Sequence, residues 1–183
     1  MNLSSLTGKK WLFKKFDTSD VQKFSENYSL SEIVAKLLAI RKNNIDDINL
    51  FLDPKVKNLL PNPLDLKDMK KAIDRIFEGL KKKESIGIFG DYDVDGASST
   101  AILSRYFLLI KQKIHTYIPD RRAEGYGPSE KGFKKLIDLG SKIIFTVDCG
   151  TLSFKPIEFA QKKNVDVIVL DHHQSDINLP EAC

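Results

Sequence analysis

Three short apolar runs in this sequence, at residues 86–89, 143–147 and 165–170, each lead directly into acidic residues. The acidic and imidazole side chains that follow them belong to Asp91, Asp93, Asp95, Asp148, Asp171, His172 and His173. If the runs are parallel strands, their carboxyl ends share one edge of a sheet, the edge where ligands bind in open α/β folds. The spacing therefore predicts that these side chains converge from distant parts of the chain.

Five carboxylates gathered at one edge repel one another, and each is costly to desolvate unless a positive charge balances it. A divalent cation provides that balance most simply. Carboxylate oxygens and imidazole nitrogens suit Mn²⁺ or Mg²⁺ better than the soft metals that prefer thiolate ligands. A cluster this rich in ligands can hold two ions about 3.5–4 Å apart, the spacing used for in-line attack at phosphorus. The pattern thus predicts a two-metal site for phosphoryl chemistry.

Each motif taken alone has a simpler interpretation. A single Asp after a strand usually forms a turn or caps a helix, and a His-His pair usually lies on the surface. The alternation of aspartates in DYDVDG alone would be compatible with a turn. Three acidic strand ends on one sheet edge are much harder to explain in this way, so the combination favours a functional site.

Three further residues near these motifs carry reactive or binding groups. Arg121 and Tyr126 lie in the polar loop that follows residues 114–118, where we expect either a plain surface loop or a substrate site. In the second case Arg121 binds phosphate and Tyr126 packs on a base or sugar. Cys149 follows Asp148, but no Cys–His pairing pattern supports a thiol nucleophile, so we predict a small buried residue.

The elements that must position this site follow from periodicity. Residues up to about 85 are predicted to be helical, with a capping box at Ser29 and Glu32, a short helix that stops at Asp53-Pro54, and an amphipathic helix over 66–80. Strands are expected at 86–89, 114–118, 143–147 and 165–170, and helices at 97–110, 133–139 and 155–163. This alternation predicts an α/β fold with a doubly wound, mainly parallel sheet covered on both faces. We expect a helical N-terminal segment over 1–84, packed alongside an α/β domain over 85–183.

Composition excludes several classes of protein. Apolar residues make up 42% of the chain and charged residues 30%, as in globular domains, and no apolar run approaches the roughly 18 residues of a membrane span. The N-terminus lacks the pattern of a signal peptide, and two cysteines without a CxxC pair favour a reducing cytoplasm. The net charge of +4 is compatible with a polyanionic substrate but does not require one.

Rival phosphate-binding folds fit the motifs less well. A dinucleotide-binding turn needs GxGxxG, and a P-loop needs GxxxxGK[ST]; the sequence has neither pattern. DVDGAS is similar to the DxDG[ST] motif of haloacid-dehalogenase phosphatases, in which the first Asp is a nucleophile. That interpretation ranks second, because it leaves Asp148, His172 and His173 without a role.

GDYDVDG, VDCG and DHH, in this order and at these strand ends, resemble the first three motifs of the DHH phosphoesterase family. More closely, nearly the whole chain resembles the N-terminal part of the family's bacterial single-strand-specific 5′→3′ DNA exonucleases. The similarity includes DPKVKNLLPNPLDLKDMKKAIDRI before the first motif, YIPDRRAEGYGPS between motifs and LPEAC after the histidines.

This resemblance implies Mn²⁺ or Mg²⁺ ligation by Asp93, Asp95, Asp148 and His172, with His173 at the metal or the scissile phosphate. Further ligands or orienting groups would then be Asp91 and Asp171. The implied reaction is metal-dependent hydrolysis of phosphodiesters in single-stranded DNA, in repair and recombination. Family members are several times longer, with a further ligating Asp and nucleic-acid-binding domains downstream. We therefore expect a truncated chain that needs a separately encoded C-terminal half, or else a different DHH phosphoesterase or a non-catalytic remnant.

Overall fold

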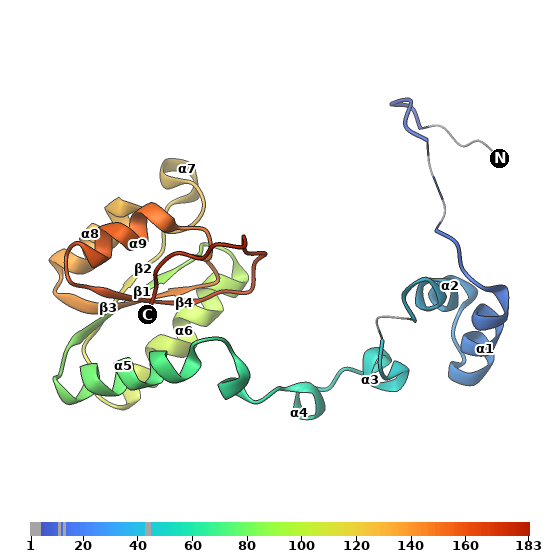
Figure 1. Cartoon of the computed structure of the whole chain (residues 1–183), viewed down its shortest axis with the longest axis horizontal. Coiled ribbons are helices and arrows are strands. Elements are labelled where there is room, and N and C mark those ends of the chain that lie inside the picture. The colour runs from blue at the N-terminus through green and yellow to red at the C-terminus, as the bar shows by residue number, and fades with distance from the viewer. Residues whose placement is uncertain (1–4, 11, 13, 43–44) are drawn as a thin grey trace. The chain divides into compact units, whose positions relative to one another are not determined.

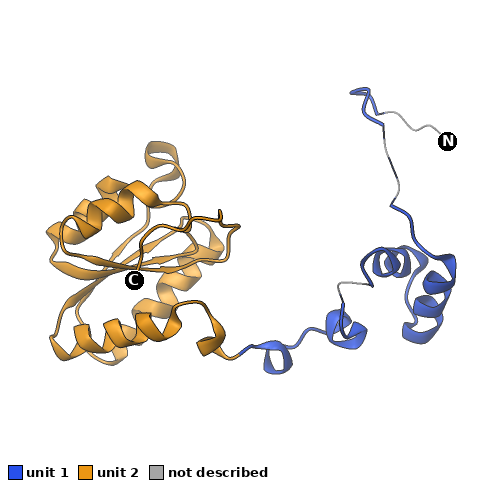
Figure 2. Ribbon diagram, in the orientation of Figure 1, with its two compact units in different colours: residues 1–61 blue, residues 62–183 orange. Residues whose placement is uncertain are grey.

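The computed structural model of this chain describes residues 5–10, 12, 14–42 and 45–183 (Figure 1). The first four residues of the N-terminal stretch, where no signal peptide is expected, lie outside the described residues. The chain divides into two compact units, residues 1–61 and 62–183 (Figure 2).

The first unit is helical, as predicted. Its helices are α1 (Thr18–Tyr28), α2 (Glu32–Arg41), α3 (Ile48–Leu52) and α4 (Val56–Leu59). Val21 of α1 packs against Ala35 and Ala39 of α2, with Phe16 and Phe24 at the margin of this small core. The helix predicted to stop at Asp53-Pro54 is α3, for which Asp53 is the C-cap.

The capping box predicted at Ser29 and Glu32 is wrong. Ser29 ends α1 instead: it adopts the left-handed conformation with φ 51°, and its N–H donates to the carbonyl of Ser25. The N-cap of α2 is Ser31, which places Glu32 at the first helical position. Because the chain passes from α1 to α2 within three residues, Ser29 is used to end one helix and cannot cap the next.

The second unit is an α/β domain whose elements match the predicted alternation. Its strands are β1 (Ser85–Gly90), β2 (Ile114–Tyr117), β3 (Ser141–Val147) and β4 (Asp166–Leu170). Its helices are α5 (Met69–Lys81), α6 (Val94–Leu109), α7 (Arg121–Glu124), α8 (Glu130–Asp138) and α9 (Phe154–Gln161), with a 3₁₀ turn η2 (Pro63–Asp65) before them. The short helix α7 lies where only a loop was predicted.

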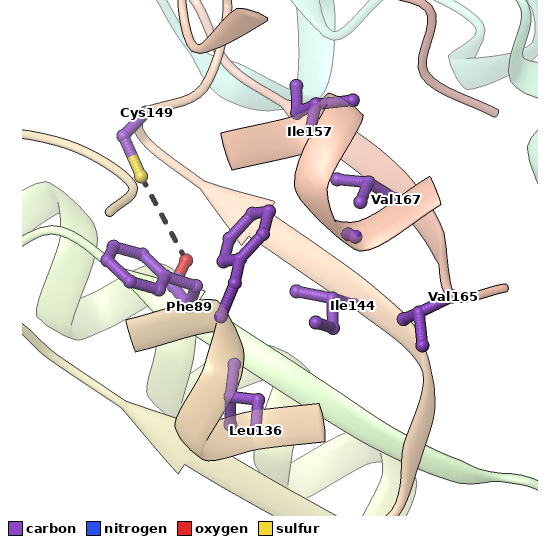
Figure 3. Packing of buried hydrophobic residues seen from close by; sticks show 9 residues of the cluster. Phe89, Leu136, Ile144, Cys149, Ile157, Val165 and Val167 are labelled. Carbon is purple, nitrogen blue, oxygen red and sulfur yellow. Dashed lines mark hydrogen bonds between the residues drawn. The ribbon is translucent and has the colours of Figure 1, made fainter. Parts of the chain in front are cut away.

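The four strands form one wholly parallel sheet with the order β2-β1-β3-β4, which confirms the predicted fold class. Alternate residues of β3 face opposite sides: Ile143 and Phe145 pack in one core and Ile144 in the other. One core contains α8 and α9 residues, including Leu136 and Ile157 (Figure 3). Residues of α5 and α6 cover the other face, so both sides of the sheet are buried.

Helix α5 belongs to the sheet unit by its contacts. Ala72 is buried against Ile143 and Ile168, and Ile76 and Leu80 pack on the same cluster. Arg75 donates to Glu84 at 2.7 Å and to Asp166 at 2.5 Å, which ties the helix to the starts of β1 and β4. The domain boundary predicted between residues 84 and 85 stays a prediction. The contacts of α5 favour a folding unit that begins near residue 62.

The segment after β4 contains no helix or strand, but it returns to the sheet. The N–H of Cys183 donates to the carbonyl of Val167 at 2.7 Å, and the Cys183 side chain packs on the core beneath α5 and α6. Among the described residues, no helix is long and apolar enough to cross a membrane.

We predict that a fragment of residues 62–183 unfolds cooperatively with nearly the stability that the same unit has in the whole chain. A fragment of residues 85–183 should lose at least about 3 kcal/mol, because it lacks the apolar side chains of α5 that cover Ile143 and Ile168. Urea unfolding followed by circular dichroism measures both. Equal stability of the two fragments would show that α5 is dispensable and that the domain begins at residue 85.

Candidate metal centre

The register of the sheet brings the predicted acidic strand ends side by side. Gly90 at the end of β1 pairs with Val147 at the end of β3, and Val147 pairs with Leu170 at the end of β4. The residues that follow these three are all aspartates: Asp91, Asp148 and Asp171. Three carboxylates therefore leave neighbouring strands at the same level of one sheet edge.

The DYDVDG turn between β1 and α6 is tight because Gly96 allows it. A Cβ atom at Gly96 would lie 2.4 Å from the backbone oxygen of Asp91, so a larger residue would push the turn away from the helix. Asp93 is the N-cap of α6, and its Oδ1 accepts hydrogen bonds of 3.0 Å from the N–H groups of Asp95 and Gly96. Helix capping and site formation thus use the same carboxylate.

Asp148 lies at the turn after β3 in an unusual conformation. Its φ of 61° is in the left-handed region, which costs a non-glycine residue about 1 kcal/mol or more. Its N–H donates to the carbonyl of Leu170 at 2.9 Å, so pairing with the end of β4 holds the turn in place. The carboxylate is 4% exposed, and its Oδ1 lies 3.0 Å from Nε2 of His172.

The side chain of Asp171 is only 3% exposed, and protein donors satisfy its carboxylate. Its Oδ2 accepts from the Thr151 hydroxyl at 2.6 Å and from the Thr151 N–H at 3.0 Å, while Oδ1 lies 2.7 Å from Nδ1 of His173. Burial alone would raise the pKa of Asp171, but these hydrogen bonds outweigh it and bring the pKa to about 2. Asp171 therefore orients the ring of His173.

Two groups of potential metal ligands share Asp148. One consists of Asp91, Asp93 and Asp148, and the other of Asp148, His172 and His173; within each group the ligand atoms lie within 4.8 Å of one another. Four of the six predicted metal ligands are thus brought together with His173, which is predicted to lie at the metal or the scissile phosphate. Asp171 supports the second group from behind, through His173.

Asp95 takes a different position from its predicted partners. It lies in the first turn of α6, is exposed, and belongs to neither ligand group in the described part of the chain. Its predicted role as a metal ligand stays a prediction.

The crowding of charge shows in the titration behaviour of the first group. Burial raises the pKa of Asp91, and the charge on Asp93 raises it further. Burial also raises the pKa of Asp148, with a second contribution from Asp93 close by. The pKa of Asp93 itself is lowered, chiefly by the hydrogen bond from the N–H of Gly96 at the start of α6. Two of the three carboxylates are therefore held in a site that disfavours their charged forms.

The donor atoms left over fit a divalent cation. Among the described residues, Oδ1 of Asp91 and Oδ2 of Asp148 are buried without any hydrogen-bond partner. A buried carboxylate oxygen without a partner is costly unless a cation binds it. Oxygen donors from three aspartates and nitrogen donors from two histidines are the set that Mn²⁺ and Mg²⁺ accept, with no thiolate among them.

Arg121 and Tyr126, predicted to bind substrate, lie on the same side of the sheet as these ligands. The Tyr126 hydroxyl is 3.3 Å from the carbonyl oxygen of Asp148 and 3.2 Å from Nδ1 of His173. Arg121 begins α7, and its guanidinium lies over the ring of Tyr92, 4.9 Å from the centroid. Tyr126 therefore contacts the ligand groups directly, whereas Arg121 contacts the aromatic residue between Asp91 and Asp93.

Cys149 is fully buried, as the sequence predicted. Its thiol donates to the carbonyl of Val147 at 3.4 Å and lies 4.0 Å from that of Phe89, pointing into the core beneath α8 and α9 (Figure 3). Burial raises the pKa of the thiol, so Cys149 is a core residue and not a nucleophile.

Sequence reasoning missed two residues that shape the site, Tyr92 and Thr151. The first contacts Arg121, and the second holds Asp171 through two hydrogen bonds. Thr151 follows VDCG directly, and a hydroxyl residue so close to an acidic strand end was a signal that could have indicated a supporting role. Nothing in the sequence pattern indicated that Tyr92 would contact a residue of the loop after β2.

This parallel sheet, with aspartates and histidines at its carboxyl edge, matches a known class of protein. Residues 85–183 match the model of the DHH family, N-terminal domain, and the chain therefore belongs to the DHH family. The resemblance drawn from GDYDVDG, VDCG and DHH is confirmed.

The proteins to which this chain is similar include several RecJ exonucleases. The single-stranded-DNA-specific exonuclease RecJ of Bacillus subtilis is 34% identical over 174 residues, which cover 94% of this chain and 22% of that protein. A crystal structure of exonuclease RecJ bound to manganese is 33% identical with a TM-score of 0.61, covering 67% of this chain and 31% of the other. RecJ of Thermus thermophilus in complex with Mn²⁺ is 25% identical with a TM-score of 0.61, covering 91% and 23%. This chain spans about a fifth of the length of the Bacillus relative.

We predict that Asp148→Ala weakens Mn²⁺ binding at least about tenfold, more than any other single ligand substitution, because Asp148 belongs to both ligand groups. Calorimetric titration of the metal-free protein with Mn²⁺ measures this. The matched control is Asp138→Ala, which removes an exposed aspartate that, among the described residues, pairs only with Lys134 on α8; it should leave the affinity unchanged. Equal affinities of the wild type and Asp148→Ala would contradict the assignment.

We also predict that Asp148→Asn stabilises the metal-free protein at pH 8 by about 1 kcal/mol, since asparagine tolerates the left-handed backbone and carries no charge. The folded state raises the pKa of Asp148, so the charged form is disfavoured above that pKa, whereas at low pH the protonated carboxyl already resembles the amide. The gain should therefore shrink as pH falls from 8 towards 4. Urea unfolding in the presence of EDTA measures it, and a variant less stable than wild type at pH 8 would refute the prediction.

Proposed function

We propose that this chain carries the metal-binding part of a phosphodiesterase that releases 5′-mononucleotides from the 5′ end of single-stranded DNA, in repair and recombination. The observation that carries the proposal is the pair of ligand groups joined by Asp148, with unpaired buried oxygens on Asp91 and Asp148. A buried acidic site of this kind is costly to keep without a cation. Two ions held about 3.5–4 Å apart by such ligands would serve phosphoryl transfer.

The residues proposed to hold the metals are Asp91, Asp93, Asp148 and His172, with Asp95 as a further candidate. Mn²⁺ or Mg²⁺ bound there supplies Lewis-acid stabilisation of the charge that develops on the phosphodiester and favours deprotonation of the attacking water. The protein contributes rigidity: Asp93 is fixed by the first turn of α6, and Asp148 by the end of β4.

Around the metals, three side chains are proposed to bind the scissile phosphate and its nucleotide. His173 belongs to the second ligand group but is proposed to face the phosphate and not the metal, because the hydrogen bond to Asp171 raises its pKa and favours a cationic imidazole. The Tyr126 hydroxyl contacts this ring, and its exposed aromatic face is available for a base or sugar. Arg121 adds a permanent positive charge with several N–H donors.

The proposed substrate comes from the named relatives, and the 5′→3′ polarity comes from the resemblance of the sequence motifs to the family's exonucleases. A relative 34% identical over 94% of this chain is named a single-stranded-DNA-specific exonuclease, and the structural relatives hold manganese. The three motifs of this chain lie in the same order at adjacent strand ends of one sheet. These similarities favour DNA over a small phosphoester as the substrate.

The share of the relatives' length that this chain covers supports a second component. In-line attack requires a substrate that is held rigidly against the metals. The residues of this chain alone are therefore expected to turn substrate over slowly. We propose that a C-terminal part, corresponding to the rest of the relatives' length, completes the active site. Two free cysteines, one of them buried, are compatible with function in the reducing cytoplasm.

We predict negligible nuclease activity for this chain alone and Mn²⁺-dependent release of 5′-mononucleotides once a C-terminal half is added. The corresponding C-terminal part of the Bacillus subtilis relative, purified separately, is a concrete partner for the test. The assay uses single-stranded DNA labelled at either end, so that products distinguish the direction of degradation. Asp148→Ala in the same mixture serves as the inactive control.

Each result of this assay decides between functions. Full activity of the isolated 183 residues would refute the need for a second half. No activity when both parts are folded and shown to associate would favour a non-catalytic interaction module. Cleavage of dinucleotides or small phosphoesters but not of long DNA would favour a different phosphoesterase of the DHH family.

A further inference from the structure

The guanidinium of Arg121 lies near the metal centre and contacts an aromatic ring. Its guanidinium carbon lies 4.9 Å from the centroid of the Tyr92 ring, and its charge is close enough to affect Asp91. In the described part of the chain it makes no ion pair and donates no side-chain hydrogen bond, although Asp91 and Asp93 flank Tyr92 in sequence. The guanidinium of Arg121 is thus held by the face of the Tyr92 ring, and its N–H donors stay free although Asp91 is close by.

The backbone of Arg121 is fixed from both ends of α7. Asp120 caps the helix, with its Oδ1 accepting from the N–H of Arg122 at 2.8 Å and of Ala123 at 3.2 Å. At the other end, the carboxylate of Glu124 accepts from the Tyr117 hydroxyl at 2.7 and 2.6 Å. The side chain of Glu124 is only 9% exposed, and Tyr117 lies at the end of β2, so the turn is anchored to the sheet.

We propose that Tyr92 and the Tyr117–Glu124 pair are positioning residues that hold Arg121 ready to bind a phosphate of the substrate at the metal centre. This inference rests on the proposed function, because it takes a phosphodiester as the ligand. It gives roles to Tyr92 and to the Tyr117–Glu124 hydrogen bond, neither of which contributes an atom to the metal-ligand groups.

An aromatic partner suits this task better than a carboxylate. An Asp or Glu paired with Arg121 would occupy two of its N–H donors and cancel its charge, so that phosphate would have to displace it. A ring face attracts the guanidinium without using the donors in its plane, which stay free for phosphate oxygens. The Tyr117–Glu124 hydrogen bond adds backbone restraint without placing a negative charge against the guanidinium.

The test measures binding of 3′-fluorescein-labelled (dT)₁₂ to the full chain by fluorescence anisotropy in the presence of Mn²⁺. Arg121→Ala should weaken binding about tenfold. Tyr92→Leu should weaken it about two- to fivefold, whereas Tyr92→Phe, which keeps the ring face, should stay close to wild type. Arg122→Ala is the matched control for loss of one positive charge in the same turn, and it should have the smaller effect of an exposed charge.

A double-mutant comparison separates positioning from a general structural effect. If Tyr92 acts through Arg121, Tyr92→Leu should have no further effect when combined with Arg121→Ala. Glu124→Gln provides a second variant, remote from the metal ligands, that should weaken binding about threefold in the wild type and not in the Arg121→Ala background. Mn²⁺ affinity, measured by calorimetry, should be the same in Tyr92→Leu, Tyr92→Phe and Glu124→Gln as in the wild type.

The inference is overturned if Tyr92→Leu and Glu124→Gln weaken binding equally with and without Arg121, or if the wild type does not bind the oligonucleotide. A Tyr92→Phe variant as weak as Tyr92→Leu would also overturn the role of the ring face. The proposed function is tested separately by cleavage in the complemented mixture. If the substitutions at Tyr92 and Glu124 act only through Arg121 but the mixture does not cleave DNA, the positioning role is upheld and the nuclease function is rejected. If the mixture cleaves DNA but these substitutions act independently of Arg121, the nuclease function is upheld and the positioning role is rejected.

Discussion

The pairing of the ends of β1, β3 and β4 in one register is the constraint on which the rest of this structure depends. Gly90, Val147 and Leu170 lie in one row, so the residues that follow them emerge side by side. With aspartate at all three following positions, folding of the sheet itself forces carboxylates together. The apolar residues of the two cores supply the free energy that makes this crowding tolerable, since both faces of the sheet are buried.

The protein provides hydrogen-bond donors to some of these carboxylates and not to others. This difference shows which carboxylates need a cation. Asp93 is stabilised by the N-terminus of α6, and Asp171 by Thr151 and His173, so both keep their charge easily. Asp91 and Asp148 are buried with oxygens that no described group satisfies. A cation bound there would balance the charge on both carboxylates, as expected of a site that is less stable without metal than with it.

Residues outside the two ligand groups hold the side chains and turns of this site in place. Asp171 orients His173, the carbonyl of Leu170 holds the turn at Asp148, and Tyr92 faces Arg121 across the edge of the sheet. Together with the Tyr126 hydroxyl, which contacts the carbonyl of Asp148 and the ring of His173, these contacts join the loops after β1, β2, β3 and β4 into one network. Membership of the DHH family gives this edge a chemical context, because the residues that match the family model include all four of these loops.

The sequence by itself determined the parallel α/β fold, the strand ends and most members of the two candidate ligand groups, because apolar runs and the acids that follow them are local patterns. It did not determine that Ser29 ends α1, since a capping box and a left-handed helix end can use the same residue. Nor did it place Asp95 apart from the ligand groups or bring Tyr92 to Arg121. Those outcomes depend on side-chain directions and on contacts between loops about 30 residues apart, which only the tertiary structure sets, because periodicity assigns a residue to an element but not to a neighbour.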